Sequence, residues 1–141
     1  MRATFFGHSD APESIKDNLK SVITELIEKQ NVNVFYVGDK GNFDLIVKKI
    51  LKSLSITYPQ IKFYVVLSYL PVKNDRSVDY SDTIFPSELE NVPRKFAIDR
   101  RNNWMIEHSD IVITYVIRNI GGAAKFKNIA ERKNKRVINV I

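Results

Sequence analysis

The sequence predicts a single α/β domain of Rossmann-like, three-layer α/β/α architecture, built on a five-stranded, mainly parallel sheet. Five short apolar segments alternate along the chain with four segments whose apolar residues recur at helical spacing. This alternation predicts a parallel sheet with helices on both faces and right-handed crossovers. The length of 141 residues fits one ordinary domain of roughly 100–150 residues, so we expect residues 1–141 to fold as one unit.

The first strand and helix are predicted from residues 2–27. Residues 2–6 are apolar and indicate a buried strand. Asp10 and Glu13 resemble a capping box, and Pro12 suits the first turn of a helix. The helix itself is indicated by one apolar stripe, formed by Ile15, Leu19, Val22, Ile23, Leu26 and Ile27.

The second and third strands are predicted at residues 32–37 and 61–67, which are rich in β-branched and aromatic residues. Between them, a second helical stripe consists of Phe43, Ile46, Val47, Ile50, Leu51 and Leu54. Tyr58-Pro59 ends that helix, because proline disfavours helical geometry in the residue before it.

The C-terminal part of the chain is predicted to add two helices and two strands. A third helix opens at Asn91 or Pro93 and runs to about His108, followed by a strand at residues 111–116. A fourth helix opens at Gly121-Gly122, and Asn134 suits its end before the last strand, at residues 137–141.

Residues 71–92 form a polar, proline-punctuated connection, with the pattern of a short strand around residues 83–85. A connection of this length inside a compact domain is typical of functional or mobile segments.

The composition excludes several classes of protein and site. No cysteine is present, which excludes disulfides, thiolate zinc sites and cysteine nucleophiles and is compatible with a cytoplasmic location. No apolar run approaches the ~20 residues of a membrane helix, and the N-terminus does not resemble a signal peptide. Two separated histidines without a carboxylate cluster do not indicate a metal site. We therefore expect a protein with no membrane partner and no bound metal.

The net charge of +6 is concentrated toward the C-terminus. Basic residues outnumber acidic ones six to one in residues 121–141. Such an excess favours anionic partners, namely phosphates, nucleotides or nucleic acid. The alternative is a solvated basic face that keeps the protein soluble.

Three glycine-bearing loops follow predicted strands: Gly7-His8, Gly38-Asp39-Lys40-Gly41 and Asn119-Ile120-Gly121-Gly122. Ligands of this fold class bind beyond the carboxyl ends of the strands, and two of these loops lead into helix N-termini, which suit phosphate. None matches a Walker loop or the GxGxxG fingerprint, and each glycine alone could simply form a turn. Together, the three loops predict an anion site at one edge of the sheet.

Motifs spread along nearly the whole chain resemble one known group of proteins. They are Gly7-His8, Gly38-x-x-Gly41-x-Phe43-Asp44, Arg100-Arg101-Asn102-x-Trp104-Met105, Ser109-Asp110, Tyr115 and Gly121-Gly122-Ala123. In these motifs the chain is similar to the SLOG superfamily and, within it, to the YpsA-type branch of bacterial proteins. The resemblance implies a Rossmann-like, SLOG-like nucleotide-binding domain over residues 1–141 and a nucleotide or nucleotide-derived ligand. More distant relatives include the DNA-processing protein DprA and the LOG-type phosphoribohydrolases.

Two positions depart from these patterns. The branch usually has arginine after Gly-His, where this chain has Ser9. The phosphoribohydrolases pair an arginine, at the position of Arg101, with a glutamate at the position of Lys127. A cation cannot replace a carboxylate base, so hydrolysis by that scheme is not expected.

Each candidate side chain has a functional and a structural interpretation. His8 could contact a phosphate or ribose, or form hydrogen bonds within its loop. Asp44 could hold a ribose hydroxyl or stabilise the start of its helix. Trp104 could stack on a base, or pack in the core or against a subunit. Tyr69 and Tyr115 end strands and could line the pocket or simply pack.

We therefore expect a sensor or regulatory module that binds a nucleotide or nucleotide-derived small molecule without catalysis, with no certain cofactor and with self-association left open. The expected ligand-binding residues are Gly7, His8, Gly38, Gly41, Asp44, Arg101, Tyr115, Gly121 and Gly122. One alternative is a hydrolase of N-glycosidic or phosphate bonds that uses Asp44 or Glu107. Another is a single-stranded DNA-binding protein, which would need an exposed aromatic platform beside the basic stripe. Phe126 and Trp104 stand at positions that suit burial instead.

Overall fold

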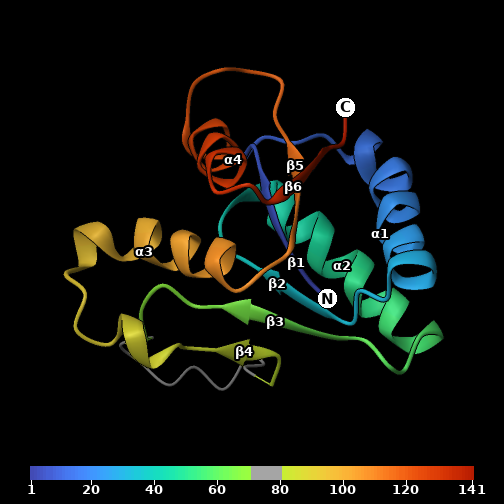
Figure 1. The fold of residues 1–141 in the computed structure, drawn as a ribbon, viewed down its shortest axis with the longest axis horizontal. Helices are drawn as coiled ribbons and strands as arrows, with labels where there is room; N and C mark the ends of the chain where they lie inside the picture. The colour runs from blue at the N-terminus through green and yellow to red at the C-terminus, as the bar shows by residue number, and fades with distance from the viewer. Residues whose placement is uncertain (71–80) are drawn as a thin grey trace.

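The computed structural model describes residues 1–70 and 81–141 as strands and helices that alternate along the chain (Figure 1). The strands are β1 (Arg2–Gly7), β2 (Val34–Val37), β3 (Lys62–Val66), β4 (Thr83–Ile84), β5 (Ile111–Tyr115) and β6 (Arg136–Asn139). The helices are α1 (Lys16–Gln30), α2 (Gly41–Thr57), α3 (Arg94–Glu107) and α4 (Gly122–Arg132), with 3-10 turns η1 (Glu13–Ile15) and η2 (Ser87–Leu89). The predicted alternation of strands and helices is confirmed.

The described strands form one parallel sheet in the order β4-β3-β2-β1-β5-β6. The prediction of five strands is therefore wrong, because the sheet has six. The added strand, β4, is only two residues long and pairs Thr83 and Ile84 with Val65 and Val66 of β3. The sequence shows a pattern at residues 83–85, but a segment this short has no alternation from which pairing with a sheet edge can be predicted.

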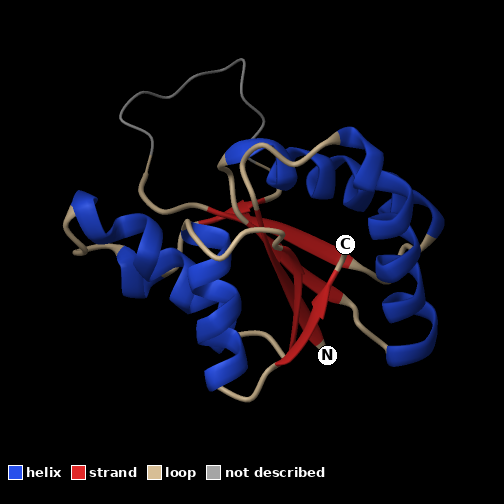
Figure 2. Cartoon of the chain, turned by 90° about the horizontal axis from the view of Figure 1, so that it is seen from above, coloured by secondary structure: helices blue, strands red, loops and turns tan. Residues whose placement is uncertain are grey.

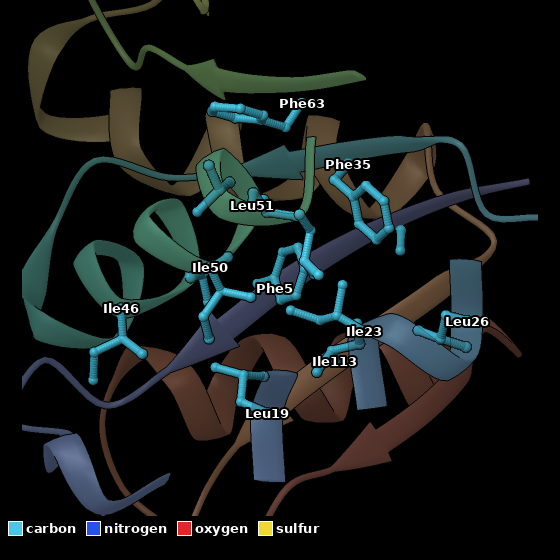
Figure 3. Packing of buried hydrophobic residues seen from close by; sticks show 14 of the residues in the cluster. Phe5, Leu19, Ile23, Leu26, Phe35, Ile46, Ile50, Leu51, Phe63 and Ile113 are labelled. Carbon is cyan, nitrogen blue, oxygen red and sulfur yellow. The ribbon is translucent and has the colours of Figure 1, made fainter. Parts of the chain in front are cut away.

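Helices cover both faces of the sheet, as Figure 2 shows. On one face, α1 and α2 bury their apolar stripes against β1, β2 and β5, and Figure 3 shows Leu19, Ile23 and Ile50 packed around Phe5. On the other face, α3 and α4 contribute Met105, Ile106, Phe126 and Ala130 to a smaller cluster. The three-layer α/β/α architecture follows from these two clusters.

The start of α1 differs from the predicted capping box. The helix is entered through η1, whose N-cap is Pro12, and no side chain caps it. Asp10 instead forms an ion pair with Arg118, at 2.8 Å. The predicted capping box at Asp10 is therefore wrong, because a distant cation binds this carboxylate in place of the local backbone.

The end of α4 agrees with the prediction, since Asn134 takes up the left-handed conformation just after the helix, with φ of 60°. Of the polar connection predicted at 71–92, residues 71–80 lie outside the described residues. In the ranges 1–70 and 81–141, no helix is long and apolar enough to cross a membrane. The same ranges contain no group of three or more His, Asp or Glu residues that could hold a metal ion.

Candidate functional site

The sheet topology creates a crevice between β1 and β5. From β1 the chain crosses over to β2 on one side, and from β5 it crosses over to β6 on the other side, so the two connections diverge at this point. Ligands of open parallel sheets bind at such a switch point. A cavity of about 420 Å³ lies there, within the usual size range of small-molecule sites.

The cavity is lined by the ends of β1 and β2, one face of α3, and the loop that leads into α4. Its lining residues are Phe5, Phe6, Gly7, His8, Ser9, Gly38, Lys40, Asp44, Ile98, Arg101, Asn102, Met105, Arg118, Ile120, Gly121, Gly122, Ala123 and Phe126. Seven of the nine expected binding residues are among them. Gly41 lines a neighbouring hollow of about 390 Å³ instead, and Tyr115 lies behind the wall.

The glycines differ in what surrounds them. A Cβ atom on Gly7 would lie 2.2 Å from the ring of Phe43, and one on Gly38 would lie 2.8 Å from the carboxylate of Asp44. At Gly121 and Gly122, a Cβ atom would meet no atom within 4 Å. The first two positions are therefore closed by neighbouring side chains, whereas the last two face open space.

Arg101 forms part of the cavity wall, although its side chain is only 2% exposed. Its Nη1 donates to Asp39 Oδ1 at 2.9 Å and to the carbonyl of Val66 at 2.8 Å, while Nε donates to Asn102 Oδ1 at 2.7 Å. These bonds fix the guanidinium group across the ends of β2 and β3. The position of Arg101 at the crevice agrees with the prediction, and its contact with a ligand anion stays a prediction.

Asp44 borders the cavity from the first turns of α2. Its Oδ2 accepts a hydrogen bond from the backbone N–H of Lys40 at 3.1 Å. Burial raises the pKa of this carboxyl group to about 7, although the Lys40 amide and the charge of Arg101 oppose the shift. Near neutral pH the group therefore exists in both forms, so it can donate or accept a hydrogen bond in the cavity. Its bond to Lys40 also supports the alternative that it stabilises the helix start.

His8 fastens two loops together at the cavity wall. Its Nε2 accepts hydrogen bonds from the backbone N–H groups of Ile117, at 3.0 Å, and Arg118, at 3.3 Å. Such bonds require a neutral ring with its proton on Nδ1. Burial lowers the pKa of His8, and the nearby Arg118 lowers it further. The geometry thus favours the structural interpretation of this residue.

Tyr115 is a wall-supporting residue rather than a lining one. Its ring is 8% exposed, stacks on Phe43 with centroids 6.4 Å apart, and meets the edge of His8. The fold therefore buries this expected binding residue behind His8.

The other aromatic and basic candidates lie away from the cavity or inside its wall. Trp104 packs against Tyr36 and His108 and donates to Glu88 at 2.5 Å. Phe126 is buried and stacks on Phe6. Lys127 is not among the lining residues and forms an ion pair with Glu131 at 2.6 Å.

The sequence did not single out the residues of the cavity rim. Ile98 and Ile120 are 42% and 75% exposed, and both line the cavity. Arg118, from the loop after β5, also lines the cavity and forms an ion pair with Asp10 at 2.8 Å. Ile98 lies three and four residues before Arg101 and Asn102, so on a helix it shares a face with them. This spacing could have indicated Ile98 from the sequence.

The loop that carries Ile120 is anchored only at its start. The side chain of Asn139 accepts from the N–H of Val116 at 2.9 Å and donates to its carbonyl at 3.0 Å. Together with the bonds that Ile117 and Arg118 donate to His8, this holds the loop as far as Arg118. Among the residues that the structure describes, none forms a hydrogen bond with the backbone or side chain of Asn119 or Ile120.

Comparisons with known proteins support the fold. No protein-family model matches the chain, and no curated protein sequence matches it significantly. Among solved structures, the chain is similar to DNA processing protein A (DprA) from Streptococcus pneumoniae, with a TM-score of 0.67 and 18% identity over 96% of this chain and 48% of that one. It is also similar to DprA from Helicobacter pylori, in a structure concerned with its single-stranded DNA binding mode, with a TM-score of 0.62 and 18% identity over 97% of this chain and 63% of that one. The chain thus spans about half to two-thirds of the length of these proteins, and the likeness concerns the Rossmann-like fold.

Proposed function

We propose that the chain binds single-stranded DNA and holds one nucleotide unit in the cavity between β1 and β5. The observation that carries this proposal is the cavity of about 420 Å³ at the switch point of the sheet. The likeness in fold to the DprA proteins supports DNA as the ligand, because one of them is described in its single-stranded DNA binding mode. It also agrees with a place for the chain in the YpsA-type branch of the SLOG superfamily, which we propose as its family. The cytoplasmic location stays a prediction.

The cavity offers a polar end and an apolar wall. At the polar end, α4 begins at Gly122, and the first N–H groups of a helix have no partner within it. Gly121 and Gly122 leave open space there, so a phosphate group can approach the backbone closely. The apolar wall contains Phe6, Met105 and Phe126, against which a base or sugar can pack.

A free nucleotide or nucleotide-derived small molecule is the second candidate ligand, in keeping with the sensor or regulatory module expected from the sequence. The cavity is compatible with it as well, since about 420 Å³ suits a small molecule. Hydrolysis has weaker support. Glu107 is exposed and pairs with Lys133 at 3.2 Å, so of the two suggested carboxylates only Asp44 borders the cavity.

The length of the ligand distinguishes these candidates. Binding of fluorescent oligothymidylates of 1, 3, 6 and 12 nucleotides should be measured by anisotropy at two salt concentrations. We expect affinity to rise with length and to fall with salt, because strand binding releases counterions. Equal affinity for the monomer and the 12-mer would favour the small-molecule candidate, and no binding to any of them would overturn the single-stranded DNA proposal.

A blocking variant tests whether the cavity is the site. Gly122→Val places its side chain in open space, so the protein should fold while oligonucleotide binding is lost. Lys127→Ala is the matched control, because it removes a cation of α4 outside the cavity lining. Arg101 is less suitable, since its truncation would leave Asp39 and the Val66 carbonyl without their donor.

A further inference from the structure

Two cations gather over one aromatic ring just outside the cavity. Nζ of Lys40 lies 5.5 Å from the centroid of the Tyr69 ring, and the guanidinium carbon of Arg94 lies 4.4 Å from it. Lys40 precedes α2, Tyr69 follows β3, and Arg94 opens α3, so three separate elements converge here. We call these three residues the cationic shelf.

The cationic shelf forms no ion pair within residues 1–70 and 81–141, the part of the chain that the structure describes. The first turn of α3 contains no acidic residue. The neighbouring carboxylate of Asp39 is bound to Arg101 at 2.9 Å. Arg94 and Lys40 also lower the pKa of the Tyr69 phenol, in agreement with their closeness to its ring. Two like charges held close together favour an anionic ligand.

The cationic shelf is continuous with the cavity. Lys40 belongs to both, because it lines the cavity as well as approaching Tyr69. Along α3, Arg94, Ile98 and Asn102 recur every four residues and therefore share one face. Ile98 and Asn102 line the cavity, so this face of α3 leads from the cavity to Arg94. Figure 1 shows α3 lying along the same side of the molecule as β3, whose extension carries Tyr69.

We propose that the cationic shelf binds the phosphodiester backbone of the strand whose nucleotide occupies the cavity. This inference rests on the proposed function and adds the path of the strand, from the switch point along α3 to Arg94. Arg94 and Lys40 contact phosphate oxygens, and Arg94 offers the planar fork of donors that suits them. Tyr69 is a positioning residue, since its ring holds the two cations side by side.

The test compares Arg94→Ala with Arg100→Ala in the full chain. Arg100 is an exposed cation of the same helix, six residues further on and off the face that leads to the cavity, so it is a matched control. With a labelled dT12, Arg94→Ala should weaken binding about five- to tenfold and reduce the slope of log affinity against log salt by about 0.7, the value for one phosphate contact on a single strand. Thymidine monophosphate should bind both variants alike, because it does not reach the cationic shelf.

Three further variants distinguish direct contact with phosphate from support of the two cations by the Tyr69 ring. Arg94→Lys should restore the salt slope, because it keeps the charge. Tyr69→Leu should weaken dT12 binding without changing thermal unfolding by more than a few degrees, whereas Tyr69→Phe should keep most of the affinity, since the ring remains.

The outcomes distinguish the two proposals. If wild type binds dT12 and Arg94→Ala behaves like Arg100→Ala, the cationic shelf is overturned and the cavity proposal stands. If wild type binds no oligonucleotide, both are overturned. A parallel titration with U12 tests whether the phosphodiester backbone is recognised. If Arg94→Ala loses equal affinity for U12 and dT12, recognition of the backbone is supported. If it loses affinity for neither, that recognition is overturned.

Discussion

The two walls of the cavity use glycine for opposite purposes. On the wall formed by β1 and β2, Gly7 and Gly38 are overlaid by the side chains of Phe43 and Asp44, so a methyl group at either position would collide. On the wall formed by the loop into α4, Gly121 and Gly122 face nothing within 4 Å. The first pair allows the interior to close, and the second keeps the approach to the backbone open. Glycines at one sheet edge therefore need not share a function, and their surroundings separate the roles.

The largest effect should come from filling the closed wall. In Gly7→Ala, the new methyl group would lie 2.2 Å from a ring that is fully buried and stacked on Tyr115. Overpacking of this kind costs about 1–3 kcal/mol, and we expect the upper end of that range. Denaturant unfolding measures it, and an unchanged midpoint would show that Phe43 can move aside at no cost.

The stability of the protein should also depend on pH through Asp44, which belongs to the closed wall. Its pKa is about 7 in the folded protein against 3.8 for the free group, so the folded state binds the proton more tightly. The contribution of Asp44 to stability should therefore fall as pH rises from about 4 to above 7. Partial exposure reduces the effect to on the order of 2 kcal/mol. Asp44→Asn should remove this slope and be the more stable protein at pH 8, and parallel stability–pH curves for the two proteins would contradict the assignment.

A smaller effect is expected at Gly121, on the open wall. Its φ of 95° is unfavourable for a residue with a Cβ atom, although the space around it is free. With ψ of 177° this conformation is essentially restricted to glycine, so Gly121→Ala should cost about 1–3 kcal/mol through backbone strain, at the lower end because no atom crowds the new methyl group. Thermal unfolding would register this as a drop of a few degrees, and a loss as large as that of Gly7→Ala would mean that the two walls do not differ.

The smallest effect on stability, and the sharpest test of the comparison, is expected for Gly122→Ala. No strain and no collision arise at this position, so stability should stay within about 0.5 kcal/mol of wild type. Binding of dT12 should nevertheless weaken, because the methyl group occupies the space where the phosphate would approach the helix start. Unfolding measurements check the unchanged stability, and anisotropy on the same samples checks the weaker binding of dT12. Undiminished binding would place the ligand away from the start of α4.

The elements of the fold were predictable because their signals are local. Apolar stripes such as Leu19 to Leu26 and punctuation such as Tyr58-Pro59 depend only on neighbours along the chain. The strand β4 and the partner of Asp10 were not predictable, because a two-residue pairing and an ion pair with Arg118 depend on tertiary contacts.

The candidate site was predictable in position but not in detail. Gly7, Gly38, Gly121, Gly122 and Arg101 line one cavity at the switch point, whereas Gly41 lines a neighbouring hollow. What each residue touches could not be predicted: Tyr115 is screened by His8, and Lys40, Tyr69 and Arg94 meet from segments far apart in the sequence. A single sequence contains no signal for such convergence.

The bonds that His8 makes to the loop after β5 also affect how much order a ligand must impose. The backbone of Ile117 and Arg118 is already fixed in the free protein, so in this rim only Asn119 and Ile120 are left to settle around a bound molecule. Fixing the backbone of one residue costs about 1–2 kcal/mol of conformational entropy. By restricting the unanchored stretch to two residues, one imidazole ring lowers the entropic cost of every binding event at the cavity, whatever the ligand.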